Sequence, residues 1–162
     1  MKEKDAKLIL EDIQKLKNKS KIIFKQTNKI KQIAKKYKKF DNFLYLGRKY
    51  NYPIAMEGAL KLKEVSYLHA EGYPTGEIKH GPIAMIGKNF PSVIICPKDS
   101  VYEKNISGIE EIKARDGKVL AIGTKSDKKL TKLSDDIIYI PKIPEMLSPI
   151  LCAIVLQLLA YY

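Results

Sequence analysis

Hydrophobic residues recur every three or four positions through residues 5–38, a stretch without glycine or proline. This spacing places apolar side chains on one side of a helix and predicts a long N-terminal amphipathic helix. The stripe consists of Ile9, Ile13, Leu16, Ser20, Ile23, Thr27, Ile30, Ala34 and Tyr37. Its two polar members weaken it, and the helix could break near Asn18–Ser20. We expect the stripe to pack on the following domain or on a second copy of the chain.

After Phe40 the pattern changes to short apolar runs that stop at turn residues, which is typical of strands buried on both faces. The runs are Phe43–Leu46, Ser92–Cys96, Val119–Ile122 and Ile137–Ile140. Helical periodicity lies between and after them, over Ile54–Tyr67, Val101–Arg115 and Pro144–Tyr162. This alternation predicts an α/β domain with a parallel sheet covered by helices on both faces.

The last helical segment is apolar enough to raise the question of a membrane span. Met146–Tyr162 has only 17 residues and includes Ser148, Pro149 and Gln157, whereas a span needs about 20 apolar residues. We therefore predict a core helix and no membrane partner. The charged start of the chain also lacks the apolar segment of a secretory signal, so we expect a cytoplasmic location.

The formal charge of +12 is concentrated at the N-terminus, where residues 1–39 hold fourteen lysines and four acidic residues. Such a segment could contact nucleic acid or an acidic surface. Arginine, the preferred side chain for bidentate contacts with phosphates and bases, occurs only at Arg48 and Arg115. We favour a solvated helix face and expect no nucleic-acid partner.

Two further features bear on cofactors. The loop Gly47–Pro53 follows the first predicted strand but has neither a dinucleotide-binding nor a P-loop pattern. Its Arg48 and Lys49 could attract an anion, although a solvated loop is the commoner explanation. The two cysteines, Cys96 and Cys152, belong to no metal or disulfide motif. We expect no nucleotide, no metal and no disulfide.

Three charged residues share one face of the helix predicted over Ile54–Tyr67. Glu57, Lys61 and Glu64 are spaced i, i+4 and i+7. On spacing alone, a surface ion-pair ladder is the commoner explanation. The helix follows the first strand, however, and ligands of open α/β sheets bind near the carboxyl ends of strands. A carboxylate beside an ammonium group there could act as a general base.

His80 is the second candidate for chemistry. It precedes Gly81 and Pro82, which mark a sharp turn, and Pro82 could begin a helix. An imidazole at such a corner can exchange protons near neutral pH. We expect His69, at the end of the preceding helix, to have a structural role.

These residues lie in a segment that resembles a known family. It reads MEGALKLKEVSYLHAEGYPTGEIKHGPIAMI over Met56–Ile86, preceded by Leu46-Gly47-Arg48 and Tyr52-Pro53. The segment resembles the isomerase portion of the glutamine–fructose-6-phosphate aminotransferase (glucosamine-6-phosphate synthase) family. The likeness is dense over about forty residues and looser to the C-terminus, and so covers about residues 43–162.

The resemblance implies a fold. Members carry two sugar-isomerase (SIS) half-domains, each a three-layer αβα sandwich, and this chain is similar to the second. Residues 41–162 would be the half-domain and residues 1–40 the connector between the halves. Because the family implies five strands, a short fifth strand is expected near Leu68–Tyr73.

The resemblance also implies a reaction, in which fructose 6-phosphate and ammonia from glutamine give glucosamine 6-phosphate without a metal or organic cofactor. By position, Glu64 matches the acid/base that moves a proton between C1 and C2 of the open-chain sugar. Lys61 matches a lysine that assists this step. His80 matches the ring-opening histidine, which reaches into the partner's site of a homodimer. We expect Glu57 to remain structural.

Several parts of the family pattern are missing from residues 1–162: the glutaminase cysteine beside the initiator methionine, the first SIS half with its phosphate-binding Ser/Thr residues, and the tail lysine that forms a Schiff base. We therefore expect negligible synthase activity from these residues alone. The alternative is a non-catalytic sugar-phosphate-binding or dimerisation module, which would need no general base.

Overall fold

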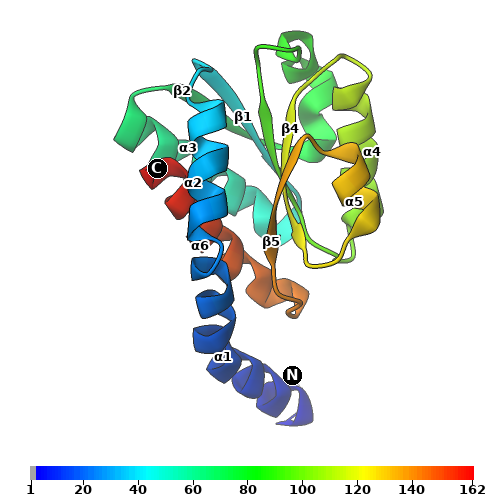
Figure 1. Cartoon of the computed structure of the whole chain (residues 1–162). Helices are drawn as coiled ribbons and strands as arrows, with labels where there is room; N and C mark the ends of the chain where they lie inside the picture. Colours follow the sequence, from blue (N-terminus) through cyan, green and yellow to red (C-terminus); the bar gives the residue numbers. More distant parts are fainter. Residues whose placement is uncertain (1–2) are drawn as a thin grey trace.

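The computed structural model describes residues 3–162, with side chains from Ala6 onward. They form a three-layer sandwich with a five-stranded sheet between two layers of helices (Figure 1). All strand pairs are parallel, and the strand order is β2-β1-β3-β4-β5. The strands are β1 (Asn42–Gly47), β2 (His69–Pro74), β3 (Ser92–Cys96), β4 (Val119–Thr124) and β5 (Asp136–Ile140). The predicted αβα fold is confirmed, including the short fifth strand, which is β2.

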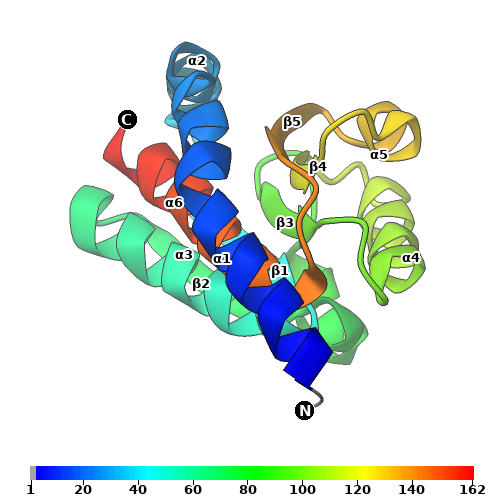
Figure 2. The same ribbon diagram turned by 90° about the horizontal axis from the view of Figure 1, so that it is seen from below.

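Each face of the sheet has its own layer of helices (Figure 2). One face is covered by α1 (Glu3–Phe24), α2 (Thr27–Tyr37), α3 (Tyr52–Ser66) and α6 (Ser148–Tyr161). The other is covered by α4 (Tyr102–Lys113), α5 (Lys128–Leu133) and the 3-10 segments η2 (Thr75–His80) and η3 (Pro82–Met85). Two further 3-10 turns are η1 (Lys49–Asn51) and η4 (Glu145–Leu147).

Strand β1 shows how the apolar runs supply both cores. Phe43 and Tyr45 are buried in the cluster beneath α3 and α6, whereas Leu44 and Leu46 are buried in the opposite cluster. Successive side chains of a strand point to opposite faces, so a run without polar residues is buried on both. The six-residue helix α5 was not predicted, since so short a segment carries no helical periodicity.

The N-terminal helical region consists of two helices, separated at Lys25 and Gln26 and not near 18–20. The Gln26 side-chain amide donates to the Tyr139 carbonyl (2.7 Å) and accepts from the Tyr139 N–H (3.3 Å). It thus pairs with the edge strand β5 as a neighbouring strand would. The Thr27 hydroxyl donates to the Phe24 carbonyl (2.6 Å) at the end of α1. The break therefore follows the docking of the helix on the sheet edge.

Only the second part of the predicted stripe is buried. Ile23, Ile30, Ile33, Ala34 and Tyr37 belong to the core. The first turns of α1 extend away from the sheet (Figure 1). Of the stripe members there, Ile13 is exposed and Ile9 is half-buried, and the neighbouring Leu8 and Leu10 are exposed.

The apolar C-terminal segment is a core helix, as predicted. Buried side chains of α6, among them Leu151, Val155 and Leu156, contribute to the same core cluster as α3. Among the helices of residues 3–162, none is both long and apolar enough to cross a bilayer.

Candidate functional site

Helix α3 carries the charged cluster predicted from the sequence. It begins with Pro53 in its first turn, a position where proline's missing N–H is no loss. It ends at Tyr67, whose left-handed backbone (φ 59°) closes the last turn through a hydrogen bond from its N–H to the Lys63 carbonyl. Its buried side, with Ala55, Ala59 and Leu62, packs on the sheet and on α6.

Lys61 lies between two carboxylates on the outer side of α3. Its Nζ is 2.7 Å from Glu64 Oε2 and 3.6 Å from Glu57 Oε1. The side chains of Lys61 and Glu64 are 32% and 51% exposed. The hydrogen bond with Glu64 raises the pKa of Lys61, with a further contribution from Glu57 and some opposition from desolvation. Lys61 therefore remains a cation.

The pair lies further from the carboxyl edge of the sheet than expected. Helix α3 starts beside the end of β1, where a Cβ on Gly47 would meet the Asn51 backbone. It then runs back antiparallel to the strands toward His69, the first residue of β2, which pairs with Asn42 at the start of β1. Glu64 is about 18 Å along the helix axis from Tyr52. The rule that ligands bind near the carboxyl ends of strands therefore applies to the start of α3. The Lys61–Glu64 pair lies at the other end of this helix, in its last turns.

His80 is the last residue of η2, which follows the carboxyl end of β2. Its side chain is 74% exposed, and Nε2 is 3.7 Å from Glu77 Oε2, too far for a hydrogen bond. Gly81 has φ 141°, a conformation for which glycine is required, so the predicted turn is confirmed. Pro82 begins the short 3-10 segment η3.

The structure brings Lys61 and Glu64 together but not His80. Ile78, from the same segment as His80, is buried in the cluster on the sheet face opposite α3. The sheet therefore lies between the layer that carries Glu64 and the layer that carries His80. His69, predicted at the end of a helix, instead begins β2, because the chain reverses at Tyr67.

A polar cluster at the carboxyl edge was missed by sequence reasoning. Lys49 contacts both Ser100 and Glu145, and the latter two contact each other. The two contacts of Ser100 join positions 51 and 45 residues apart. Only the basic loop after the first strand gave any signal of this cluster.

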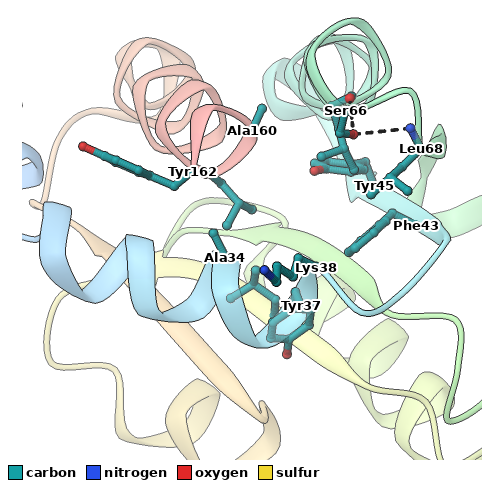
Figure 3. Close-up of a pocket in the computed structure, with 12 residues that line it drawn as sticks. Ala34, Tyr37, Lys38, Phe43, Tyr45, Ser66, Leu68, Ala160 and Tyr162 are labelled. Carbon is teal, nitrogen blue, oxygen red and sulfur yellow. Dashed lines mark hydrogen bonds between the residues drawn. The ribbon is translucent and has the colours of Figure 1, made fainter.

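A cavity of about 140 Å³ lies between α2, α3, α6 and the first residues of β1 (Figure 3). Its lining is mostly apolar, and none of the predicted site residues contributes to it. The Ser66 hydroxyl accepts a hydrogen bond from the Leu68 N–H (3.3 Å). Burial, with a smaller effect of Asp136, raises the pKa of Tyr37 well above its usual range. The phenol therefore stays neutral near neutral pH.

Within residues 3–162, no group of three or more His, Cys, Asp or Glu side chains is arranged to hold a metal ion. Both cysteines are buried, and burial raises the pKa of the Cys96 and Cys152 thiols far above the usual value. They are inert as nucleophiles near neutral pH.

A parallel sheet of order 2-1-3-4-5 with helices on both faces defines a three-layer, doubly wound α/β domain. Its charged cluster lies on a helix that packs on the sheet, and the loop after β1 has no nucleotide-binding pattern. The SIS domain family matches residues 36–162, and the chain belongs to this family.

Curated relatives are similar over most of the chain. The chain is 56% identical over 133 residues to the glutamine–fructose-6-phosphate aminotransferase of Aquifex aeolicus, which covers 82% of the chain and 22% of the relative. It is 47% identical over 160 residues to the enzyme of the same name from Chlorobaculum tepidum, covering 99% and 26%. The chain thus spans about a quarter of the length of these relatives.

Solved structures of sugar-phosphate enzymes have a similar fold. The C-terminal domain of glucosamine-fructose-6-phosphate aminotransferase from Francisella tularensis superposes with a TM-score of 0.93 at 35% identity, over 99% of this chain and 45% of that one. Tagatose-6-phosphate ketose/aldose isomerase from Escherichia coli has a TM-score of 0.67 at 19% identity, over 75% of this chain and 34% of that one, and shares the fold.

Proposed function

We propose that this chain is the C-terminal isomerase half-domain of a glucosamine-6-phosphate synthase, which forms glucosamine 6-phosphate from fructose 6-phosphate and glutamine-derived ammonia. The proposal is carried by the Lys61–Glu64 pair on the outer face of α3, in a chain 56% identical to an aminotransferase of this kind. Its ligand would be a sugar phosphate, and its location the cytoplasm. Residues 1–40 would connect it to the first half.

In the proposed reaction, Glu64 transfers a proton between adjacent carbons. Ammonia first replaces the C2 carbonyl oxygen of the open-chain ketose with nitrogen, releasing water. The Glu64 carboxylate then takes a proton from C1 and returns it to C2. The C1 hydroxyl loses its proton and the nitrogen gains one, which leaves an aldehyde at C1 and an amine at C2. Lys61, 2.7 Å from the carboxylate, holds it in place. His80 would open the sugar ring beforehand by moving a proton to the ring oxygen.

A chimera tests this function. The matching segment of the Aquifex aeolicus enzyme is replaced by this chain, which is similar to it over 133 residues. We expect the chimera to form glucosamine 6-phosphate from fructose 6-phosphate and glutamine, and residues 1–162 alone to form none. A chimera that folds, by circular dichroism, yet makes no product would favour the alternative, a non-catalytic sugar-phosphate-binding or dimerisation module.

A subunit-mixing experiment tests the shared site of a homodimer. Lys61 and Glu64 lie in the layer opposite His80, so we propose that His80 serves the site of a second copy. Chimeras carrying Glu64→Gln or His80→Asn are each expected to be inactive. After denaturation and refolding together, half of the dimers are mixed and each has one intact site, which gives about a quarter of the original activity.

The control is each variant refolded alone. If Glu64 and His80 of the same copy formed the site, every mixed dimer would have two defective sites. Recovery no greater than in the separate refolded variants would therefore contradict the shared site.

A further inference from the structure

The sheet changes direction at the carboxyl ends of β1 and β3. From β1 the chain passes through α3 to β2 at one edge, and from β3 through α4 to β4 toward the other. Ligands of open α/β sheets commonly bind at such a switch point. In this chain the loop after β1 supplies Lys49 and the loop after β3 supplies Ser100, and their side chains are in contact at this switch point.

The Glu145 carboxylate contacts both of these residues. Glu145 Oε1 is 2.6 Å from Lys49 Nζ and accepts from the Ser100 hydroxyl (2.9 Å), while Oε2 accepts from the Ser100 N–H (3.1 Å). Lys49 Nζ also donates to the Ser100 hydroxyl (2.7 Å). An ammonium group, a hydroxyl and a backbone N–H are donors that bind phosphate oxygens in other proteins.

The local backbone fixes the positions of both Glu145 and Lys49. Glu145 belongs to η4, where its own carbonyl accepts from the Ser148 hydroxyl (2.8 Å), which fixes the start of α6. Lys49 has a left-handed backbone (φ 49°), a conformation uncommon for residues other than glycine. The neighbouring Asp99 uses Oδ1 to accept from the Val101 N–H (3.0 Å) and leaves the Ser100 donors to Glu145.

Glu145 is ionised at neutral pH. The hydrogen bond from Lys49 lowers the pKa of Glu145. Burial opposes this effect, and the hydrogen bonds from Ser100 lower the pKa further. The same ion pair raises the pKa of Lys49. The two charges therefore persist together over the physiological range.

We propose that Lys49 and Ser100 form an anion-binding cradle filled from within the chain by Glu145, and that the cradle binds a phosphate monoester once this carboxylate is removed. In this SIS domain, Glu145 would prevent the switch point from gripping the phosphate of a sugar. This proposal is independent of the proposed function, because the Lys61–Glu64 pair lies elsewhere, on the outer side of α3.

Phosphate binding to the 162-residue chain and to Glu145→Ala tests this proposal. Inorganic phosphate is titrated against chloride at matched ionic strength, and the Ser100 amide is followed by ¹H–¹⁵N NMR. We expect a saturable shift of this amide in Glu145→Ala, with an affinity about tenfold or more above that of the unmodified chain. The double variant Glu145→Ala/Lys49→Met should lose this gain.

Two further variants keep the result interpretable. Glu145→Gln retains the side-chain shape and a hydrogen-bond acceptor but loses the charge. Its phosphate affinity should therefore fall between those of the unmodified chain and Glu145→Ala. Glu103→Ala removes an exposed carboxylate of α4 that is 2.6 Å from Lys129 of α5, and it should leave the Ser100 response unchanged. The cradle proposal is overturned if Glu145→Ala has a folded NMR spectrum but binds phosphate no better than the unmodified chain. It is also overturned if Glu103→Ala raises the phosphate affinity as much as Glu145→Ala does.

Discussion

We expect Glu64→Gln to lower the rate of glucosamine 6-phosphate synthesis by the chimera by a factor of about 10²–10⁴, the usual range for loss of a general acid/base. Glutamine has nearly the same shape and can still accept a hydrogen bond from Lys61, but it cannot take a proton from C1. The loss should therefore fall on kcat measured at saturating fructose 6-phosphate, with little change in KM.

Glu57→Gln is the matched control. Glu57 lies on the same helix, approaches the same Lys61 (3.6 Å) and is exposed to a similar degree, at 40%. If the three charges form only a surface ladder, the two substitutions should act alike and cost about 1 kcal/mol of stability at most. Equal loss of activity in both variants would remove the specific acid/base role of Glu64, whereas we expect the rate with Glu57→Gln to stay within a few-fold of the original.

We expect Gly72→Ala to lower the free energy of unfolding by about 3 kcal/mol. A Cβ at position 72 would lie 2.6 Å from Met56 Cα and 2.8 Å from Met56 N. Both are backbone atoms, so no rotamer change relieves the clash, and α3 must move away from β2. Since domains of this size have a total stability of about 5–15 kcal/mol, the loss is large. Urea unfolding followed by circular dichroism measures it.

Gly87→Ala provides the comparison within the same chain. No atom lies within 4 Å of the Cβ it would add, and Gly87 does not have a positive φ. We expect its free energy of unfolding to change by less than about 1 kcal/mol. Comparable destabilisation by both substitutions would show that lost glycine flexibility matters more than the close approach of α3. Because α3 carries Lys61 and Glu64, Gly72→Ala should also lower the activity of the chimera.

The fold could be predicted to a large extent from local patterns. Ser92–Cys96 is a strand with the predicted bounds, and the other three apolar runs differ by one or two residues at their ends. The fifth strand, β2, could not be predicted from an apolar run, because it includes polar and small residues such as Glu71 and Gly72. Only the resemblance to the family indicated this strand. β2 is an edge strand, so burial places weaker demands on its sequence.

The helix break shows the limit of a periodic pattern. Helical spacing through residues 5–38 describes which side chains can share a face, and it contains no information on where that face meets the sheet. The break at Gln26 depends on Tyr139, which is 113 positions away. Such a contact exists only after the chain has folded.

The sequence by itself determined the features that depend on near neighbours: the class of fold, the strands buried on both faces, and the contact between Lys61 and Glu64, which helical geometry brings together at a spacing of three. The tertiary structure alone decided where these features lie. It put the Lys61–Glu64 pair in the last turns of α3, put His80 in the opposite layer, and closed Lys49 and Ser100 around Glu145. The physical reason is that dihedral preferences and periodicity act over a few residues, whereas these placements follow from burial of both sheet faces, which involves the whole chain at once.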